Sequence, residues 1–366
     1  MKKRCIVLLL AMLANSITVF GAESANYNYF LTELQIPVKT DAVVLTLEEA
    51  TQKALTHSTT LKNSNMDLSI SEQKLESEEN NIAGGYTFQQ LLNYIKQNAN
   101  YTTSKLSREV TEEGVKFSLK QVYIEIINKE REIALIKQNI KNTENELLIT
   151  KTKAKLGLIS EQEVNNQELN YQKTLANVQQ QEINVKNAYQ SLAKLINMDT
   201  ETYQLTLEPV YMPLELEMSL DTYIKGKINT DPNIKQKQIS LDTAESEAKF
   251  THATVPETTT ADEEADNSVA KASLSLADEK TNLRTKIENC YDSIVNLETS
   301  YNNNLQELET LKKQLAIVQK KYELKQNTEL DVLKAKQSIA EKESEIIGQM
   351  YEHMLLMEQF ENSYLL

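Results

Sequence analysis

Two copies of one pattern occupy this chain, and they limit its fold more than any other feature. The segment LEEATQKALTHSTTLKNSNMDLSISEQ, which begins at Leu47, aligns without a gap on LDTYIKGKINTDPNIKQKQISLDTAES, which begins at Leu220, at an offset of 173 residues. Further on, LGLISEQEV from Leu156 aligns on LKQNTELDV from Leu324 at an offset of 168. Two aligned pairs in the same order indicate a tandem duplication of one supersecondary unit.

The composition favours long helices over compact globular domains. The 366 residues include only 7 Gly, 5 Pro and no Trp, so few residues would interrupt a helix. The formal net charge of -14 argues against nucleic acid as a partner, because binding a polyanion requires clustered Lys and Arg.

The N-terminus reads as a signal peptide over residues 1–21. A basic start, KKR, precedes an apolar run over 6–14, and small residues permit cleavage after Gly21 or, as a second choice, after Ala22. An uncleaved anchor is the alternative, but the apolar run is shorter than the ~20 residues that span a bilayer. Removing this segment leaves Cys290 as the one cysteine, so we expect no internal disulfide and a buried thiol on a helix seam.

Apolar residues recur every seven positions beyond the leader. The clearest column is Ile287, Ile294, Tyr301, Leu308, Leu315 and Tyr322, and similar columns run through 116–155, 161–197 and 329–360. Repeats of seven sustained over several turns predict left-handed coiled-coil packing. Asn304 interrupts a companion column and is the polar exception that fixes the register of a seam. We therefore predict an all-α fold of long antiparallel coiled-coil hairpins.

Turn and capping signals place the hairpin tips. Ser160 with Glu163 forms a capping box after the first long helix, and Thr328 with Asp331 repeats it in the second half. The predicted tips are Leu156–Ser160 and Leu324–Thr328. The two shorter helices begin at similar signals, Thr46 with Glu49 and Asp231 before Pro232.

Three segments lack the seven-residue repeat of apolar residues. Residues 198–217 contain Pro209 and Pro213 and a short alternating run at 203–207, which indicates a connector with a short strand. Residues 251–266 are Thr-rich and acidic, which predicts a mobile linker. Residues 80–114 contain a Gly pair and a modest helical stretch over 88–95.

No arrangement of residues typical of catalysis is present. The three His residues have no companions at ligand spacing, and the sequence contains no Gly-rich phosphate loop and no Cys/His cluster. Four tyrosines, Tyr171, Tyr189, Tyr301 and Tyr322, fall on seam columns, where packing explains them better than binding. We expect no enzyme, no cofactor and no metal site.

Several segments together resemble TolC-type outer-membrane efflux proteins. They are LTLEEATQKAL and SLDTYIKGKI at the starts of the halves, AKLGLISEQEVNNQ and YELKQNTELDVLKAKQSI at the tips, and LINMDTETYQLTLEP at the connector. The resemblance covers about residues 45–360. It implies a homotrimer whose helices form a TolC-like α-barrel body. It also implies that the tips dock a periplasmic adaptor bound to an inner-membrane pump.

The resemblance assigns partner docking to residues at the two tips: Leu156, Gly157, Leu158, Ile159, Ser160, Leu324 and Thr328. In this chain Leu158 and Ile159 could instead serve only to close the turn. The expected units are the signal peptide at 1–21, a first repeat at 45–197, the connector at 198–217 and a second repeat at 218–363 that includes the linker at 251–266.

In one respect the chain departs from this family. The family's membrane strands should lie at 80–114 and 251–266, and such a strand needs ~9–11 residues of alternating character. Neither segment alternates, so we expect little or no β-structure. Two functions follow, both for an exported protein of the cell envelope. One is a passive duct component of a tripartite efflux or type I secretion assembly in the outer membrane. The alternative is an envelope coiled-coil scaffold or adaptor-docking protein without pore activity.

Overall fold

The computed structural model describes residues 43–198, 203–254 and 260–366, so the predicted signal peptide lies outside the described residues. In chain order the elements are β1 (Val43–Thr46), α2 (Leu47–His57), α3 (Thr59–Ile82), α4 (Phe88–Lys155), α5 (Glu161–Ile196), β2 (Tyr203–Thr206), α6 (Leu220–Thr230), α7 (Pro232–Thr254), α8 (Thr260–Glu323), α9 (Glu329–Glu361) and the 3-10 turn η1 (Ser363–Leu365).

The helix boundaries reproduce the duplication seen in the sequence. The bounds of α2 and α6 differ by 173 at both ends, while the end of α4 and the start of α5 lie 168 residues before the end of α8 and the start of α9. The same local signals set these boundaries. Thr46 and Ser160 form the expected capping boxes, and Asp231 accepts hydrogen bonds from the first N–H groups of α7. The prediction of two tandem helical repeats is confirmed.

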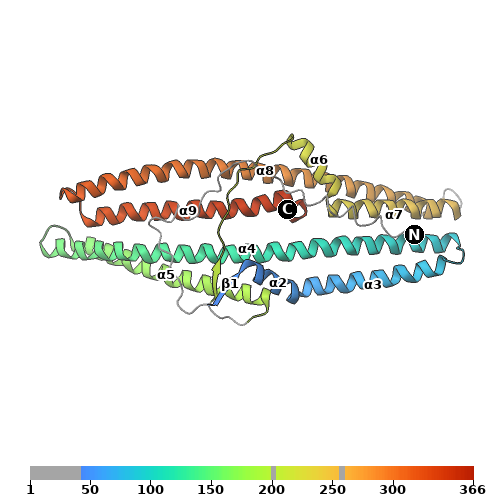
Figure 1. Ribbon diagram of the computed structural model, residues 1–366, viewed down its shortest axis with the longest axis horizontal. Helices are drawn as coiled ribbons and strands as arrows, with labels where there is room; N and C mark the ends of the chain where they lie inside the picture. Colours follow the sequence, from blue (N-terminus) through green and yellow to red (C-terminus); the bar gives the residue numbers. More distant parts are fainter. Residues whose placement is uncertain (1–42, 199–202, 255–259) are drawn as a thin grey trace, which may run out of the picture.

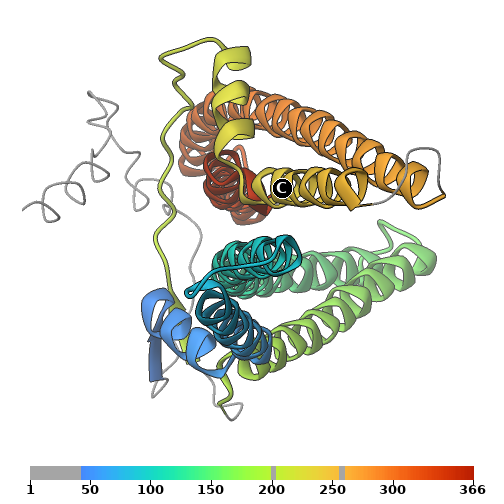
Figure 2. The same cartoon turned by 90° about the vertical axis from the view of Figure 1, so that its right-hand side faces the viewer.

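Each half is a long antiparallel arrangement built on one continuous helix. The helices α4 and α8 run most of the length of the molecule (Figure 1). The helices α3 and α5 pack one after the other along α4, and α7 and α9 pack in the same way along α8. The helix α4 also packs against α7 and α9, so the two halves lie side by side, with the connector after β2 running along one side (Figure 2).

The predicted heptad columns form the buried core. On α8 the residues Ile287, Ile294, Tyr301, Leu308 and Leu315 are all buried. On α9 the column contributes Ile339, Ile346, His353 and Phe360, which are also buried. Burying one such aliphatic side chain stabilises the fold by about 1.5–3 kcal/mol. The residues of the seven-residue repeat therefore account for much of the packing energy.

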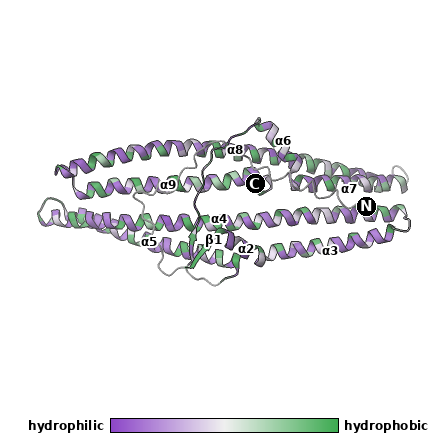
Figure 3. Cartoon of the chain, viewed as in Figure 1, coloured by the Kyte–Doolittle hydropathy of each residue, from purple (hydrophilic) through white to green (hydrophobic). Residues whose placement is uncertain are grey.

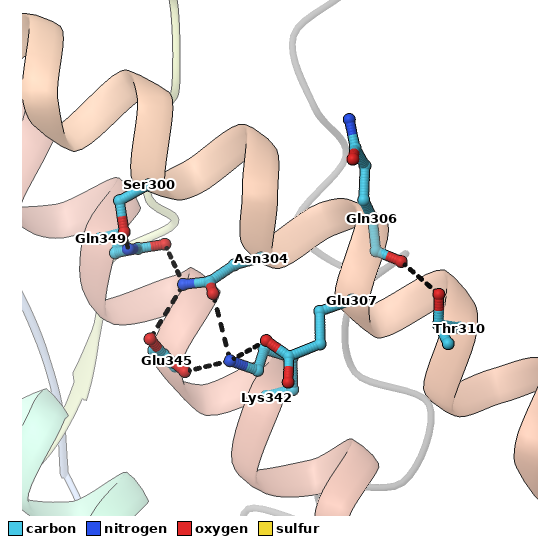
Figure 4. A network of polar contacts seen from close by, with 8 residues as sticks. All are labelled: Ser300, Asn304, Gln306, Glu307, Thr310, Lys342, Glu345 and Gln349. Carbon is cyan, nitrogen blue, oxygen red and sulfur yellow. Dashed lines mark hydrogen bonds and ion pairs between the residues drawn. The ribbon is translucent and has the colours of Figure 1, made fainter.

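A polar network interrupts the seam between α8 and α9 at Asn304 (Figure 4). The Asn304 amide donates to Glu345 at 2.9 Å and to Gln349 at 3.0 Å, and its carbonyl oxygen accepts from Lys342 at 3.1 Å. Lys342 also pairs with Glu307 at 2.8 Å. Because a shift of one helix along the other would break all of these contacts, the network fixes the register of this hairpin, as predicted for Asn304.

Two short strands join the start of the chain to the connector. The strands β1 and β2 pair in parallel, with Val43 opposite Tyr203 and Thr46 opposite Thr206. The alternating run in the connector predicted β2. The strand β1 was not predicted, because its four residues lie directly before the capping box of α2 and show no separate pattern.

One expectation about the irregular segments is wrong, and another gave a helix that is too short. The expected linker at 251–266 is helical at 251–254 and 260–266, and residues 255–259 lie outside the described residues. Thr251 and Thr254 bond back to main-chain carbonyls four residues earlier, and the acidic residues at 262–263 suit the first turn of α8. The modest helix expected at 88–95 is the start of the 68-residue α4.

Apolar and polar residues are interspersed along the long helices (Figure 3). Within residues 43–198, 203–254 and 260–366, no helix combines the length and the apolar character needed to cross a bilayer.

Candidate functional site

The two hairpin tips lie at the same end of the molecule (Figure 1). One is the turn between α4 and α5, and the other is the turn between α8 and α9. The tandem repeat explains this arrangement, because two halves that pack in parallel place equivalent turns together. The tips thus form a composite surface at one end of a rod.

Glycine allows the first tip to turn sharply. Gly157 has φ +72°, in the left-handed region that a residue without Cβ adopts easily. Its N–H donates to the Ala154 carbonyl at 2.9 Å, and the next N–H, of Leu158, donates to Lys153 at 3.0 Å. These two bonds close the end of α4 in a Schellman motif. The capping box of Ser160 then starts α5.

The second tip repeats this geometry without glycine. Lys325 occupies the position of Gly157 and has φ 55°. Its N–H donates to Tyr322 at 2.9 Å, and that of Gln326 donates to Lys321 at 2.8 Å. A left-handed residue with a Cβ costs roughly 1–2 kcal/mol, so the second tip is the more strained. The sequence did not predict a left-handed lysine.

Both tips carry exposed leucines. Leu156 and Leu158 are each 69% exposed, and Leu324 is 68% exposed. The Ile159 side chain is half-buried, whereas the Leu158 side chain is mostly exposed. Tyr322 was expected on the core column but is 45% exposed. It lies in the last turn of α8, beyond the start of α9, so it is only partly covered.

An acidic side chain behind the tips fixes their relative position. Glu146 of α4 pairs with Lys334 of α9 at 2.7 Å and accepts a hydrogen bond from Gln167 of α5 at 2.9 Å. It therefore bridges three helices from both halves. At the second tip, the main-chain N–H and the hydroxyl of Thr328 lower the pKa of the Asp331 carboxyl. Sequence patterns gave no signal for Glu146, because its partners lie on different helices.

The buried histidine and cysteine have structural roles in the core. His353 is buried and lies 2.9 Å from Glu298, whose carboxylate also accepts from the N–H of Leu214 in the connector. Cys290 is buried, and burial raises the pKa of its thiol to about 11. Across the part of the chain that the structure describes, His, Cys, Asp and Glu form no group able to hold a metal ion.

Comparison with known proteins connects this architecture to outer-membrane channels. No family model and no curated protein matches the sequence. Among solved structures, the CmeC outer membrane channel of Campylobacter jejuni has a TM-score of 0.67 at 12% identity, covering 94% of this chain and 88% of that one. The MtrE outer membrane channel of Neisseria gonorrhoeae, in its open state, has a TM-score of 0.68 at 12% identity, covering 94% and 95%.

A third similar structure is the outer membrane protein VceC of Vibrio cholerae, with a TM-score of 0.66 at 12% identity, covering 87% of this chain and 95% of that one. The fold predicted from the resemblance to TolC-type proteins is therefore confirmed. The likeness extends along nearly the whole chain and rests on shape, since few residues are identical.

Proposed function

We propose that this protein is an exported, TolC-like duct component of an efflux or type I secretion assembly in the cell envelope. Three copies would form a closed helical wall, and the tips would dock an adaptor that is bound to an inner-membrane pump. The duct itself is passive, so the choice of cargo would lie with the pump. One observation carries the proposal: both hairpin tips expose leucines at one end of a fold shared with outer-membrane channels.

The seam within the chain supports ring closure. At the internal seam, α4 of the first half packs against α7 and α9 of the second. The duplication gives α8 the same role as α4, and gives α3 and α5 the roles of α7 and α9. One side of α8 and one side of α3 and α5 therefore remain at opposite edges of the molecule, where they can pair with neighbouring copies.

Exposed apolar residues mark both edges. Leu274 of α8 is 65% exposed, whereas its equivalent on α4, Leu106, is half-buried. Ile183 of α5 is 52% exposed, whereas its equivalent Tyr351 is fully buried. Covering such residues against a second copy would remove apolar surface from water, which is the main driving force of association.

Complementation of export separates docking at the tips from a purely structural role. We expect cells that lack the gene to accumulate dyes from a panel of export substrates, or to lose secreted proteins, and the wild-type chain to restore export. A chain carrying Leu158→Ser and Ile159→Ser should fail to restore export. As a control, Met218→Ser changes an apolar residue that is 50% exposed and distant from the tips, and it should restore export fully.

The melting temperature of each variant shows whether the substitution destabilises the fold. Full export by the tip variant, or lower melting with export retained, would exclude docking through the first tip. An unchanged export profile in cells without the gene would exclude the duct function altogether.

The scaffold function is the second candidate, and one observation favours it. The described segments at 80–82, 88–114, 251–254 and 260–266, where membrane strands of the family are expected, are helical. A scaffold without pore activity predicts that loss of the gene weakens the envelope, for example toward detergent, while the export of every panel substrate stays normal.

A further inference from the structure

Two polar pairs connect the halves near the end opposite the tips. Lys96 of α4 forms an ion pair with Glu247 of α7 at 2.7 Å. Eleven residues along each helix, the amide of Gln236 donates to the hydroxyl of Ser107 at 3.2 Å. Since eleven residues make about three helical turns, both pairs lie on the same faces of α4 and α7.

Because of the duplication, residues equivalent to these pairs lie on the two free edges of the molecule, on α8 and on α3. The offset of 168, which relates the ends of α4 and α8, carries Ser107 to Ser275 on α8. The offset of 173 carries Gln236 to Asn63 on α3. A hydroxyl and an amide therefore recur, one on each edge. All four helices are continuous over these positions, so each mapped residue keeps its helix face.

The ion pair recurs with its charges exchanged. The same offsets carry Lys96 to Glu264 on α8 and Glu247 to Lys74 on α3. Both Lys74 and Glu264 are exposed, and neither forms an ion pair with the described residues. A copy whose α8 edge meets the α3 edge of its neighbour would therefore bring opposite charges together.

Pairing of like halves would instead bring like charges together. Contact between the α3 edges of two copies would bring Lys74 toward Lys74, and contact between two α8 edges would bring Glu264 toward Glu264. Repulsion against the wrong partner is an effective source of specificity.

We propose that this exchange of charge assigns the partner of each edge: Lys74 on α3 of one copy pairs with Glu264 on α8 of the next copy, so that first and second halves alternate around the assembly. The inference rests on the proposed function, because it concerns the ring that the duct requires. It adds which surfaces meet and why halves of the same kind do not.

Disulfide cross-linking of the full mature chain tests the contact. Cysteines at Asn63→Cys and Ser275→Cys should join copies into a ladder that ends at three chains under mild oxidation. The matched control, Ser107→Cys with Gln236→Cys, should form its bond within one chain and give no ladder. The native Cys290 is buried and takes no part.

Charge reversal tests the specificity. Lys74→Glu should raise the concentration for half-assembly about tenfold, and salt should reduce this defect, since it opposes two exposed carboxylates. Glu264→Lys should act similarly, and the double variant Lys74→Glu with Glu264→Lys should regain wild-type assembly. Glu76→Lys reverses a charge two residues away, on the opposite face of α3, and should have no effect.

The outcomes separate the two proposals. A ladder that forms together with a Lys74→Glu variant that assembles normally would overturn the charge assignment and leave the ring intact. A double variant that fails to recover would also overturn it. A monomeric protein without any ladder would overturn the ring, and with it the proposed duct.

Discussion

The hydroxyl of Tyr123 donates a hydrogen bond to the main-chain carbonyl of Leu45 at 2.6 Å and accepts one from the N–H of Thr206 at 2.9 Å. Tyr123 belongs to α4 and is fully buried, while its partners lie in β1 and β2. One side chain of the first long helix thus holds both the start of the fold and the connector. In the second half, Tyr351 of α9 donates to the carbonyl of Leu207 at 2.5 Å, so a second tyrosine fixes the same connector.

Replacing Tyr123 by Phe should destabilise the protein. The change keeps the ring in the core but leaves buried main-chain groups of Leu45 and Thr206 without their partner, at a cost of about 1–3 kcal/mol. Thermal unfolding followed by circular dichroism measures the effect. Tyr291→Phe is the control, because Tyr291 packs at the rim of the core and its hydroxyl forms no hydrogen bond with the described residues. Equal melting of both variants would contradict this role of Tyr123.

Substitutions at the left-handed residues of the two tips should change the stability of the protein in opposite directions. Gly157→Ala forces a Cβ into the left-handed region and should lower stability by about 1 kcal/mol, whereas Lys325→Gly should relieve strain and raise stability. Urea denaturation of both variants gives the sign of each change. A stabilising Gly157→Ala would show that the left-handed turn does not limit the first tip.

Acidic substitutions should distinguish the buried column from the exposed surface. Leu308→Asp places a carboxylate at a position only 3% exposed and should cost several kcal/mol or prevent folding. Ile133 is half-buried, so Ile133→Asp should cost less. Leu148 is 64% exposed, and Leu148→Asp should leave the melting temperature nearly unchanged. If all three variants melt alike, the seven-residue columns do not form the core.

Alkaline pH should destabilise the fold. Burial raises the pKa of Cys290 from 9.0 to about 11, and burial, followed by the charge of Glu298, raises that of Tyr211 from 10.0 to about 12. Because folding favours the neutral forms, their contribution is complete below the unfolded pKa values and disappears as pH rises through the folded ones. The urea midpoint should therefore be lower at about pH 11 than at about pH 8. Tyr211→Phe should reduce this difference. A flat profile would contradict it.

The sequence predicted the parts of the fold that follow from local chemistry and from the seven-residue repeat. The columns through Leu308 and Ile346, the capping boxes and the two tips all lie where expected. The N-terminal part of α4 was missed because residues 93–113 are mostly polar and carry no sustained repeat of seven. This part is helical because α3 and α7 pack along it, which is tertiary context that a single-sequence pattern lacks.

At the candidate site, the sequence located the tips but did not separate Leu158 from Ile159. Which of two adjacent apolar residues is covered depends on the path of the chain between α4 and α5, and that path follows from the left-handed turn at Gly157. Glu146 was missed for a related reason. Its partners, Lys334 and Gln167, meet it only after both hairpins have packed.

In the proposed assembly, several copies of this chain close into a hollow helical wall. Native mass spectrometry of the purified mature protein, combined with electron microscopy of the same sample, measures the number of copies and the presence of a lumen. We expect three copies around an open lumen, with all hairpin tips at one end. A monomer at every accessible concentration, or a solid bundle with tips at both ends, would contradict it.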